Sequence, residues 1–481
     1  MNTAELDAPG FRDRISTVDE DGKRIWLHPK KPSGKWYRYR SVLSWGLLAF
    51  LFAGPWLRIQ GEPLLLLNVV ERKFVVLGQV FWPHDLYLFL LATLIFIVFI
   101  ILFTVVFGRL FCGWVCPQTI FMEMLFRKIE YALEGDYMAQ RALDKKPWNA
   151  EKIMKRGTKH LLFFILSVLI ANTFLAYIIG SESVVGLITD GPQAHVGGFV
   201  AMLIFSALFY GVFAQFREQV CTGVCPYGRL QGVLLDRNSV AVTYDHVRGE
   251  SRGKMRKGQD RAELGLGDCI DCFQCVAVCP TGIDIRNGTQ LECTNCTACI
   301  DACNTIMEKV GQPRGLVRYA SEASIADGKA WKITRRAVAY SIVLVGLLVA
   351  MGSVLYLRTD VETKLLRTPG MTFQTREDGR ISNLYNVKML NKTNEAMDLK
   401  FALLNWPEGE IQWVGEGITR VESQEAAEGT LFIILPYERL APMKNRLEVG
   451  IYRNGELIEI VKTNFMGPFK GRGAIDEGVR E

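Results

Sequence analysis

The sequence CIDCFQCVAVCP at residues 269–280 is followed by CTNCTACIDAC at residues 293–303. In both segments the second, third and fourth cysteines follow the first by three, six and ten residues. These two segments hold eight of the chain's 12 cysteines. Thiolates repeated at short fixed intervals are soft metal ligands, so the stretch predicts a metal-binding domain.

Each segment has the C-x2-C-x2-C-x3-C spacing of bacterial-type ferredoxins with two 4Fe-4S clusters. Three thiolates two residues apart can surround one cluster, whereas the fourth points away and ligates the other cluster. The pattern predicts cluster 1 on Cys269, Cys272, Cys275 and Cys303, and cluster 2 on Cys293, Cys296, Cys299 and Cys279. Pro280 fits the pattern, but Asn304 stands where a second proline is expected. Such clusters transfer single electrons.

Structural zinc and disulfides are the alternatives for these cysteines. Zinc needs four ligands in one tetrahedral set, often including His, and no His lies between Cys269 and Cys303. Disulfides need an oxidising compartment. The duplicated spacing therefore favours the two clusters.

The other four cysteines form a weaker repeat, Cys112-Gly-Trp-Val-Cys116-Pro117 and Cys221-Thr-Gly-Val-Cys225-Pro226. The prolines predict that Cys116 and Cys225 stand at helix starts, where the helix dipole lowers a thiol pKa. Four such thiols could take part in redox relay, bind Cu(I) or hold a further iron-sulfur centre. The alternative is that they are buried cysteines at the membrane edge that serve packing.

The composition indicates a membrane protein, because 49% of the 481 residues are hydrophobic and the mean hydropathy is positive. Apolar stretches of spanning length occur at about 41–57, 86–108, 161–180, 197–216 and 337–357. The first is short and contains Pro55, so we expect it to tilt or to end early. The run Leu64 to Val70 is too short to span, and we expect it to lie at the membrane surface or to re-enter.

Basic residues indicate the orientation. The segment from Arg109 to Lys159 is rich in Lys and Arg, whereas the loop from Ser181 to Gly191 has neither, so the former is predicted inside. Residues 1–40 lack a signal peptide and end in basic residues, so they are predicted to be cytoplasmic. Five spans then place every cysteine on the reducing cytoplasmic side and the C-terminal tail outside.

Residues 358–481 change character. Alternating apolar runs occur from Leu384 to Leu390, Leu399 to Leu404, Leu431 to Leu435 and Leu447 to Ile451. Asn454-Gly455 joins the last run to another at Leu457 to Val461, which is a strong hairpin signal. The pattern predicts a small all-β, Ig-like sandwich. It has no cysteine, so it is more suited to docking than to redox chemistry.

The predicted fold class is thus a multidomain membrane protein with about five spans. It comprises a cytoplasmic N-terminal segment (1–40), a transmembrane region with both Cys-x3-Cys-Pro motifs (41–240), a cytoplasmic ferredoxin domain (241–330), a last span (337–357) and a periplasmic Ig-like domain (358–481).

Two further features carry weaker predictions. His84 and His195 both fall at outer ends of spans, where they could meet to bind haem or copper, although two isolated surface histidines would look the same. The basic stretch Arg248 to Arg261 has no interleaved aromatic residues, so a solvated positive-inside linker fits it better than a nucleic-acid-binding patch.

The chain resembles the FixG/RdxA/CcoG family of membrane ferredoxin-like proteins over nearly its whole length. The resemblance rests on the segment Ile283-Asp-Ile-Arg-Asn-Gly-Thr-Gln-Leu-Glu-Cys293 with its continuation to Cys303, on Pro313-Arg-Gly-Leu-Val-Arg-Tyr319, on Leu65 to Val69 with Phe81-Trp82-Pro83, on both Cys-x3-Cys-Pro motifs and on the C-terminal domain.

The resemblance implies a bacterial cytoplasmic-membrane protein that reduces Cu(II) to Cu(I) during assembly of a C-family haem-copper cytochrome c oxidase. It implies copper-delivery proteins and the oxidase assembly machinery as partners, and it carries cluster and motif roles onto the cysteines named above. Fold-level likeness alone would not assign a substrate.

Two other functions stay open. Related membrane ferredoxins with the same Cys-x3-Cys-Pro motifs resemble quinol dehydrogenases that feed a reductase. A non-enzymatic assembly scaffold with structural clusters is the third, and it predicts that cluster-ligand mutants that still fold remain functional. The sequence leaves open the electron donor, the copper donor and acceptor, the oligomeric state and whether a haem or flavin is present.

Overall fold

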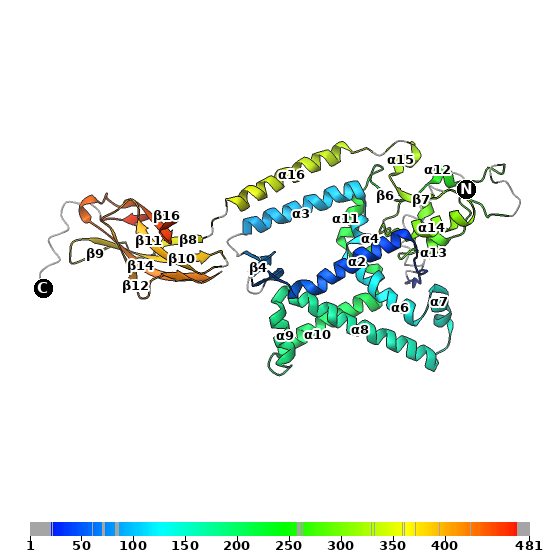
Figure 1. Cartoon of the computed structure of the whole chain (residues 1–481), viewed down its shortest axis with the longest axis horizontal. Coiled ribbons are helices and arrows are strands. Elements are labelled where there is room, and N and C mark those ends of the chain that lie inside the picture. Colours follow the sequence, from blue (N-terminus) through cyan, green and yellow to red (C-terminus); the bar gives the residue numbers. More distant parts are fainter. Residues whose placement is uncertain are drawn as a thin grey trace. The chain divides into compact units, whose positions relative to one another are not determined.

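The computed structural model describes residues 21–468, except residues 22, 60, 70–72, 82–85, 257–260, 262, 329, 331, 358, 360, 371, 394 and 424. The chain divides into two compact units (Figure 1). One is a helical unit within Met1–Gly78 and Trp82–Met351, and the other is a β-rich unit of Gln79–Phe81 and Gly352–Glu481.

Four helices among the described residues are long and apolar enough to cross a membrane. They are α3 (Leu86–Phe107), α8 (Ala150–Ile179), α10 (Val196–Gly211), which η4 (Val212–Phe216) continues as π-helix, and α16 (Arg335–Tyr356). The helices expected at the last four apolar stretches are therefore confirmed. Helix α8 begins before its apolar part because the Asn149 side chain accepts a hydrogen bond of 2.9 Å from the Lys152 N–H.

Helix α2 (Lys35–Ala53) covers most of the first predicted span but is not one of these four. It ends early, as expected, and passes into the short helix η1 (Gly54–Trp56). Pro55 lacks a backbone N–H and cannot continue the α-helical bonding pattern.

The N-terminus of α2 is capped by a residue from far along the chain. Gly34 precedes the helix and has no side chain to accept a hydrogen bond. Instead, the buried carboxylate of Asp301 accepts hydrogen bonds from the backbone N–H groups of Trp36, at 3.2 Å, and Tyr37, at 2.8 Å. The start of α2 is thus fixed by the segment that contains Cys299 and Cys303.

The apolar run at 64–70 forms part of a hairpin. Strand β3 (Leu65–Asn68) pairs antiparallel with β4 (Lys73–Val76), and β1 (Arg58–Ile59) pairs with β2 (Glu62–Pro63). Leu66 and Asn68 are buried whereas Leu67 is exposed, which is the alternation of a strand. The segment predicted to lie at the membrane surface or to re-enter is therefore a strand with paired backbone groups.

Shorter elements complete the helical unit. They are α4 (Leu110–Trp114), α5 (Pro117–Ile120), η3 (Phe121–Phe126), α6 (Arg127–Leu133), α7 (Tyr137–Lys145), α9 (Ser181–Thr189), η5 (Val220–Val224), α11 (Pro226–Leu234), α12 (His246–Gly249), α13 (Gln274–Ala277), η6 (Ile285–Asn287), α14 (Ala298–Lys309), α15 (Glu322–Ala326) and the paired strands β6 (Ala241–Tyr244) and β7 (Val317–Ala320).

The β-rich unit is an antiparallel two-sheet structure. One sheet has the order β12-β14-β10-β8 with β9 beside β10, and the other has the order β13-β11-β15-β16. The Asn454-Gly455 hairpin is confirmed, because Arg453 pairs with Glu456 and both turn residues have positive φ.

The strands of this unit are longer than the apolar runs predicted. Their bounds are β5 (Gln79–Phe81), β8 (Val361–Arg367), β9 (Gln374–Thr375), β10 (Ile381–Asn391), β11 (Met397–Leu403), β12 (Glu410–Val414), β13 (Arg420–Val421), β14 (Ala426–Leu435), β15 (Lys444–Arg453) and β16 (Glu456–Met466), with the short helix η7 (Tyr437–Arg439).

A network of buried ion pairs joins the helices to the cysteine-rich segment. Arg127 is 1% exposed, pairs with Glu123 at 2.9 Å and Glu218 at 3.4 Å, and donates to the carbonyl of Pro280 at 3.3 Å. Pro280 directly follows Cys279. Because buried charges need partners, this arrangement fixes α6, the segment before Cys221 and the first cysteine loop against one another.

We expect Arg127→Met to destabilise the helical unit strongly. The substitution leaves the carboxylates of Glu123 and Glu218 buried without this partner, and breaking a buried pair in this way costs about 3–5 kcal/mol. The measurement is the temperature at which helical circular dichroism is lost in detergent. Arg420→Met, which removes an exposed pair with Glu422, is the control. Equal unfolding temperatures for the two variants would contradict the role of the network.

Candidate iron-sulfur and thiol sites

The two cysteine loops share one backbone shape. The residues on either side of the second cysteine have positive φ in both loops, namely Asp271 and Phe273 beside Cys272, and Asn295 and Thr297 beside Cys296. Left-handed backbone is uncommon in residues other than glycine. The duplicated spacing is therefore matched by a duplicated fold of the backbone.

A helix follows each loop and holds its third cysteine. Cys275 lies in α13, and Cys299 and Cys303 lie on successive turns of α14. Asn304 replaces the expected proline inside α14, where proline would remove a helical hydrogen bond. Its side chain accepts a hydrogen bond of 2.9 Å from the Gly315 N–H. Asparagine at this position therefore keeps α14 continuous and bonds the helix to the chain at Gly315.

Two cavities lie against these loops. Cavity A is lined by four cysteines, Cys269, Cys272, Cys275 and Cys303, together with residues that include Tyr244 and Arg286. Cys303 comes from the second cysteine segment, whereas the other three come from the first. The cavity therefore contains the crossed set of thiols that the sequence predicts for cluster 1.

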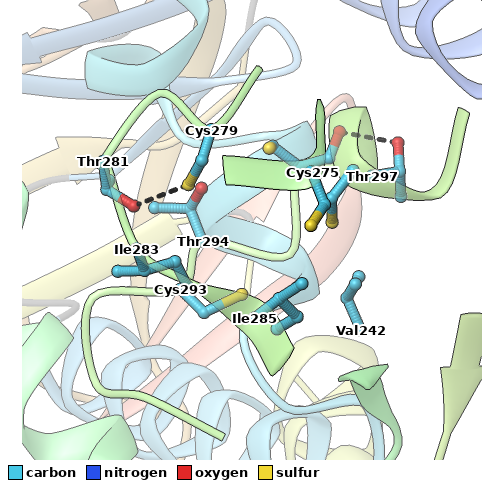
Figure 2. A pocket seen from close by; sticks show the side chains of 11 residues that line it. Val242, Cys275, Cys279, Thr281, Ile283, Ile285, Cys293, Thr294 and Thr297 are labelled. Atoms are coloured by element: carbon cyan, nitrogen blue, oxygen red, sulfur yellow. Dashed lines mark hydrogen bonds between the residues drawn. The ribbon is translucent and has the colours of Figure 1, made fainter. Parts of the chain in front are cut away.

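Cavity B is shown in Figure 2. It is lined by Cys293, Cys296 and Cys299 from the second segment and by Cys279 and Cys275 from the first. Thr281 Oγ1 lies 3.4 Å from Cys279 Sγ and holds this thiol in place. The set predicted for cluster 2 is complete here, and Cys275 lines both cavities.

The donor sets fit 4Fe-4S groups better than single ions. Among the residues that the structure describes, no group of three or more His, Cys, Asp or Glu side chains is arranged to hold one metal ion. Cluster ligands stand further apart than the ligands of one ion because four iron atoms lie between them. Each cavity supplies four thiols and a mainly apolar lining, which is the environment of ferredoxin clusters.

Burial controls the protonation of these thiols. It raises the pKa of Cys275, Cys293 and Cys303 to about 12, against an ordinary value near 9. The metal ligand is the thiolate, so metal binding must release the thiol protons.

The Cys-x3-Cys-Pro motifs also share a backbone shape. The N–H of Cys116 donates to the carbonyl of Phe111 at 2.9 Å, and the N–H of Cys225 donates to the equivalent carbonyl of Val220 at 2.7 Å. Helices α5 and α11 start at the prolines that follow. The predicted helix starts are therefore confirmed.

The structure brings these four thiols together in what we call the four-cysteine site, made of Cys112, Cys116, Cys221 and Cys225. Cys221 interacts electrostatically with the other three, and Cys112 interacts with Cys116 and Cys225. Burial raises the pKa of Cys112 and of Cys221 to about 12. The prediction of a helix-dipole effect concerns the other two cysteines, Cys116 and Cys225. The Cys112 thiol donates to Oε1 of the fully buried Gln231 at 3.0 Å.

The four-cysteine site lies directly against the second cysteine loop. A Cβ added to Gly113 would stand 2.4 Å from the carbonyl oxygen of Thr294, so α4 touches the backbone between Cys293 and Cys296. The Trp114 indole donates to the Tyr319 hydroxyl at 3.1 Å, and this hydroxyl donates to the Asn295 carbonyl at 3.1 Å. The sequence did not predict this contact. Gly113 stands between two cysteines, and a glycine at such a position can indicate that another part of the backbone approaches closely.

The histidine pair predicted for haem or copper is not tested by the structure. His84 lies outside the described residues. His195 is largely exposed, and its Nε2 lies 3.3 Å from an Asp190 carboxylate oxygen.

Three family models match the chain. A 4Fe-4S binding domain covers residues 89–133, a 4Fe-4S dicluster domain covers residues 216–322, and the Ig-like fold at the C-terminus of FixG covers residues 351–468. The first match contains Cys112 and Cys116, and the second contains the remaining ten cysteines.

Individual relatives match over most of their length. Protein RdxA of Cereibacter sphaeroides is 35% identical over 79% of this chain and 82% of its own. The chain belongs to the FixG/RdxA family. Nitrogen fixation protein FixG of Rhizobium meliloti is 30% identical over 87% of this chain and 88% of its own, and protein RdxB of Cereibacter sphaeroides is 33% identical over 79% and 82%.

Membership of the FixG/RdxA family confirms the resemblance drawn from the sequence. The protein is a FixG-like electron-transfer protein with 4Fe-4S domains, long apolar helices and a C-terminal Ig-like domain. The descriptions of these family models and relatives do not name copper, haem or flavin.

We expect Gly113→Ala to separate α4 from the second cysteine loop, because the added Cβ would meet a backbone oxygen at 2.4 Å. The unfolding temperature should fall, and iron should be lost from cavity B. Gly223→Ala is the matched control, since it lies between the cysteines of the other motif and its Cβ would meet no atom within 4 Å. Iron analysis and thermal unfolding check both variants. An unchanged iron content and unfolding temperature in Gly113→Ala would refute the close contact.

Proposed function

We propose that the protein is a membrane cupric reductase in which electrons pass through two 4Fe-4S clusters to Cu(II) at the four-cysteine site. The observation that carries the proposal is the contact of Gly113 with Thr294, which places the motif between Cys112 and Cys116 beside cavity B. The copper substrate itself comes from the resemblance to the FixG/RdxA/CcoG family.

The cluster ligands follow from the two cavities. Cys269, Cys272, Cys275 and Cys303 hold the cluster of cavity A, and Cys293, Cys296, Cys299 and Cys279 hold that of cavity B. The clusters supply one-electron storage. Cys275 lines both cavities, so the two centres are neighbours and no long protein gap interrupts the electron path.

Because each cluster takes one ligand from the other segment, replacing that ligand should impair the cluster of the segment in which the ligand does not lie. Cys303→Ser should impair the cluster whose other ligands lie in the first segment, and Cys279→Ser should impair the one whose other ligands lie in the second. Electron paramagnetic resonance of the dithionite-reduced protein should lose a different signal in each variant. Loss of the same signal in both variants would overturn the assignment.

The four-cysteine site suits the product of the reaction. Among the described residues no three ligand side chains are arranged around one ion, so copper would bind two of these four thiols at a time. Thiolates are soft ligands that prefer Cu(I) to Cu(II), so bound copper is stabilised after it gains an electron. One reduced cluster gives one electron to one Cu(II), which becomes Cu(I), while the cluster returns to its oxidised state. Burial keeps the Cys112 and Cys221 thiols protonated, so copper that binds them as thiolates must displace their protons to water.

The copper step is tested by mixing the reduced, cluster-loaded protein anaerobically with Cu(II) and following cluster reoxidation together with Cu(I) trapped by a chelator. We expect one Cu(I) per electron, and a loss of rate of about tenfold or more in Cys116→Ser and Cys225→Ser, in keeping with removal of a soft ligand. Gly223→Ala should react like the parent. Unchanged reduction by the two serine variants would rule out copper at this site.

The membrane arrangement is part of the proposal. Helices α2, α3, α8, α10 and α16 make five spans, with the N-terminus and all cysteines in the cytoplasm and the Ig-like domain in the periplasm of the inner membrane. The basic segment after α3 and the segment from Ser181 to Gly191 after α8, which has no Lys or Arg, support this orientation. The partners are then lipid, copper-delivery proteins and the machinery that assembles a haem-copper oxidase.

A specific cavity favours quinol dehydrogenation as the second candidate. An apolar cavity of about 460 Å³ lies between α2, β3, α5, η3 and α8, and Val115 and Pro117 on either side of Cys116 line it. It could hold the ring of a membrane quinol, which would give up two electrons, one per cluster, and release two protons to water. This function predicts two results. A short-chain quinol should reduce the clusters, and added Cu(II) should not reoxidise them.

A further inference from the structure

Arg109 is a buried cation between the four-cysteine site and cavity B. It is 6% exposed and forms the N-cap of α4. Its guanidinium lies beside Gly228 of α11, because a Cβ there would stand 3.4 Å from Arg109 Nη2 and 3.9 Å from Cys225 Cβ. The neighbouring Gly108 faces the second cysteine loop, where its Cβ would lie 3.4 Å from Asn295 Nδ2. Arg109 therefore stands where the two groups of cysteines meet.

The positive charge of Arg109 acts on both groups. Its guanidinium lies beside Cys225 of the four-cysteine site, and the chain at Gly108 packs on Asn295, which stands between the cavity B cysteines Cys293 and Cys296. Its Nε has no hydrogen-bond partner, and no ion pair joins Arg109 to a carboxylate within the part of the chain that the structure describes. A buried cation that no carboxylate neutralises acts more strongly on its surroundings than the same charge would in water, because the protein interior screens it less.

Cavity A differs in this respect. Its arginine, Arg286, pairs with Asp271 at 2.5 Å and with Asp284 at 2.6 Å, so its charge is neutralised locally. Arg248, whose charge acts on Cys303, pairs with Asp268. The two cavities thus have similar thiol sets but different net charge nearby.

A cluster with four thiolates is anionic and becomes more negative when it gains an electron. Nearby uncompensated positive charge stabilises the reduced state, and net charge is one of the factors that set cluster potentials. We propose that Arg109 is a positioning residue for electron transfer, whose unpaired charge raises the reduction potential of the cavity B cluster above that of the cavity A cluster. Electrons then collect beside the four-cysteine site.

This inference rests on the two-cluster part of the proposed function and not on copper. Arg109 lies outside every cysteine motif, and in this proposal its charge sets the direction of electron flow. The same guanidinium also lies close to Cys225 of the four-cysteine site.

The test is a redox titration of the cluster-loaded protein in detergent, followed by electron paramagnetic resonance. The Cys279→Ser variant identifies the cavity B signal. In Arg109→Gln we expect the reduction equilibrium of this cluster to shift toward the oxidised form by about tenfold, which is 59 mV for one electron. The cavity A cluster and the iron content should stay unchanged.

Two controls separate charge from structure. Arg109→Lys keeps the charge and should restore the parent potential of the cavity B cluster, and this variant decides the matter if Arg109→Gln fails to hold clusters. Arg248→Gln removes a paired cation and should leave the cavity B potential in place. Either of two results would overturn the proposal. One is an unchanged potential of the cavity B cluster in Arg109→Gln with full iron content, and the other is a tenfold shift of its reduction equilibrium in Arg109→Lys. Absence of clusters from the parent protein would instead defeat the proposed function.

Discussion

The constraint on which the structure depends is that each cluster cavity needs a cysteine from the other half of the repeat. Cavity A is incomplete without Cys303, and cavity B is incomplete without Cys279. The left-handed residues on either side of Cys272 and Cys296 bend the two loops into equivalent shapes. Helix α14 then returns Cys303 to the first loop, so the loops and the helix must form together.

This paired unit organises the rest of the helical part. Gly113 admits the backbone of the second loop, Arg127 binds the carbonyl after Cys279, and Asp301 caps α2. The four-cysteine site is consequently held by the ferredoxin-like loops and not only by its own helices. In the proposed function, electrons cross between the two thiol groups through protein backbone and without a diffusing carrier, and this closeness makes that path short.

Much of this could be predicted from sequence where spacing alone sets geometry. The crossed cysteine sets, four of the apolar helices and the Asn454-Gly455 hairpin follow from local periodicity and turn chemistry. The run at 65–68 was harder, because a short apolar segment has no period that separates a strand from a membrane-surface segment. The roles of Gly113, Arg109 and Asp301 depend on contacts between residues more than a hundred positions apart, and no local pattern encodes them.

The capping of α2 by Asp301 has a consequence for the order of folding. The helix emerges early in synthesis, yet the carboxylate that satisfies its first N–H groups lies 265 residues later, measured from Trp36. Contacts of such long sequence separation form slowly because a large loop must close first. Helix α2 therefore remains without its cap until the cysteine-rich segment has been synthesised, and folding of that segment is also the step that completes the N-terminal helix.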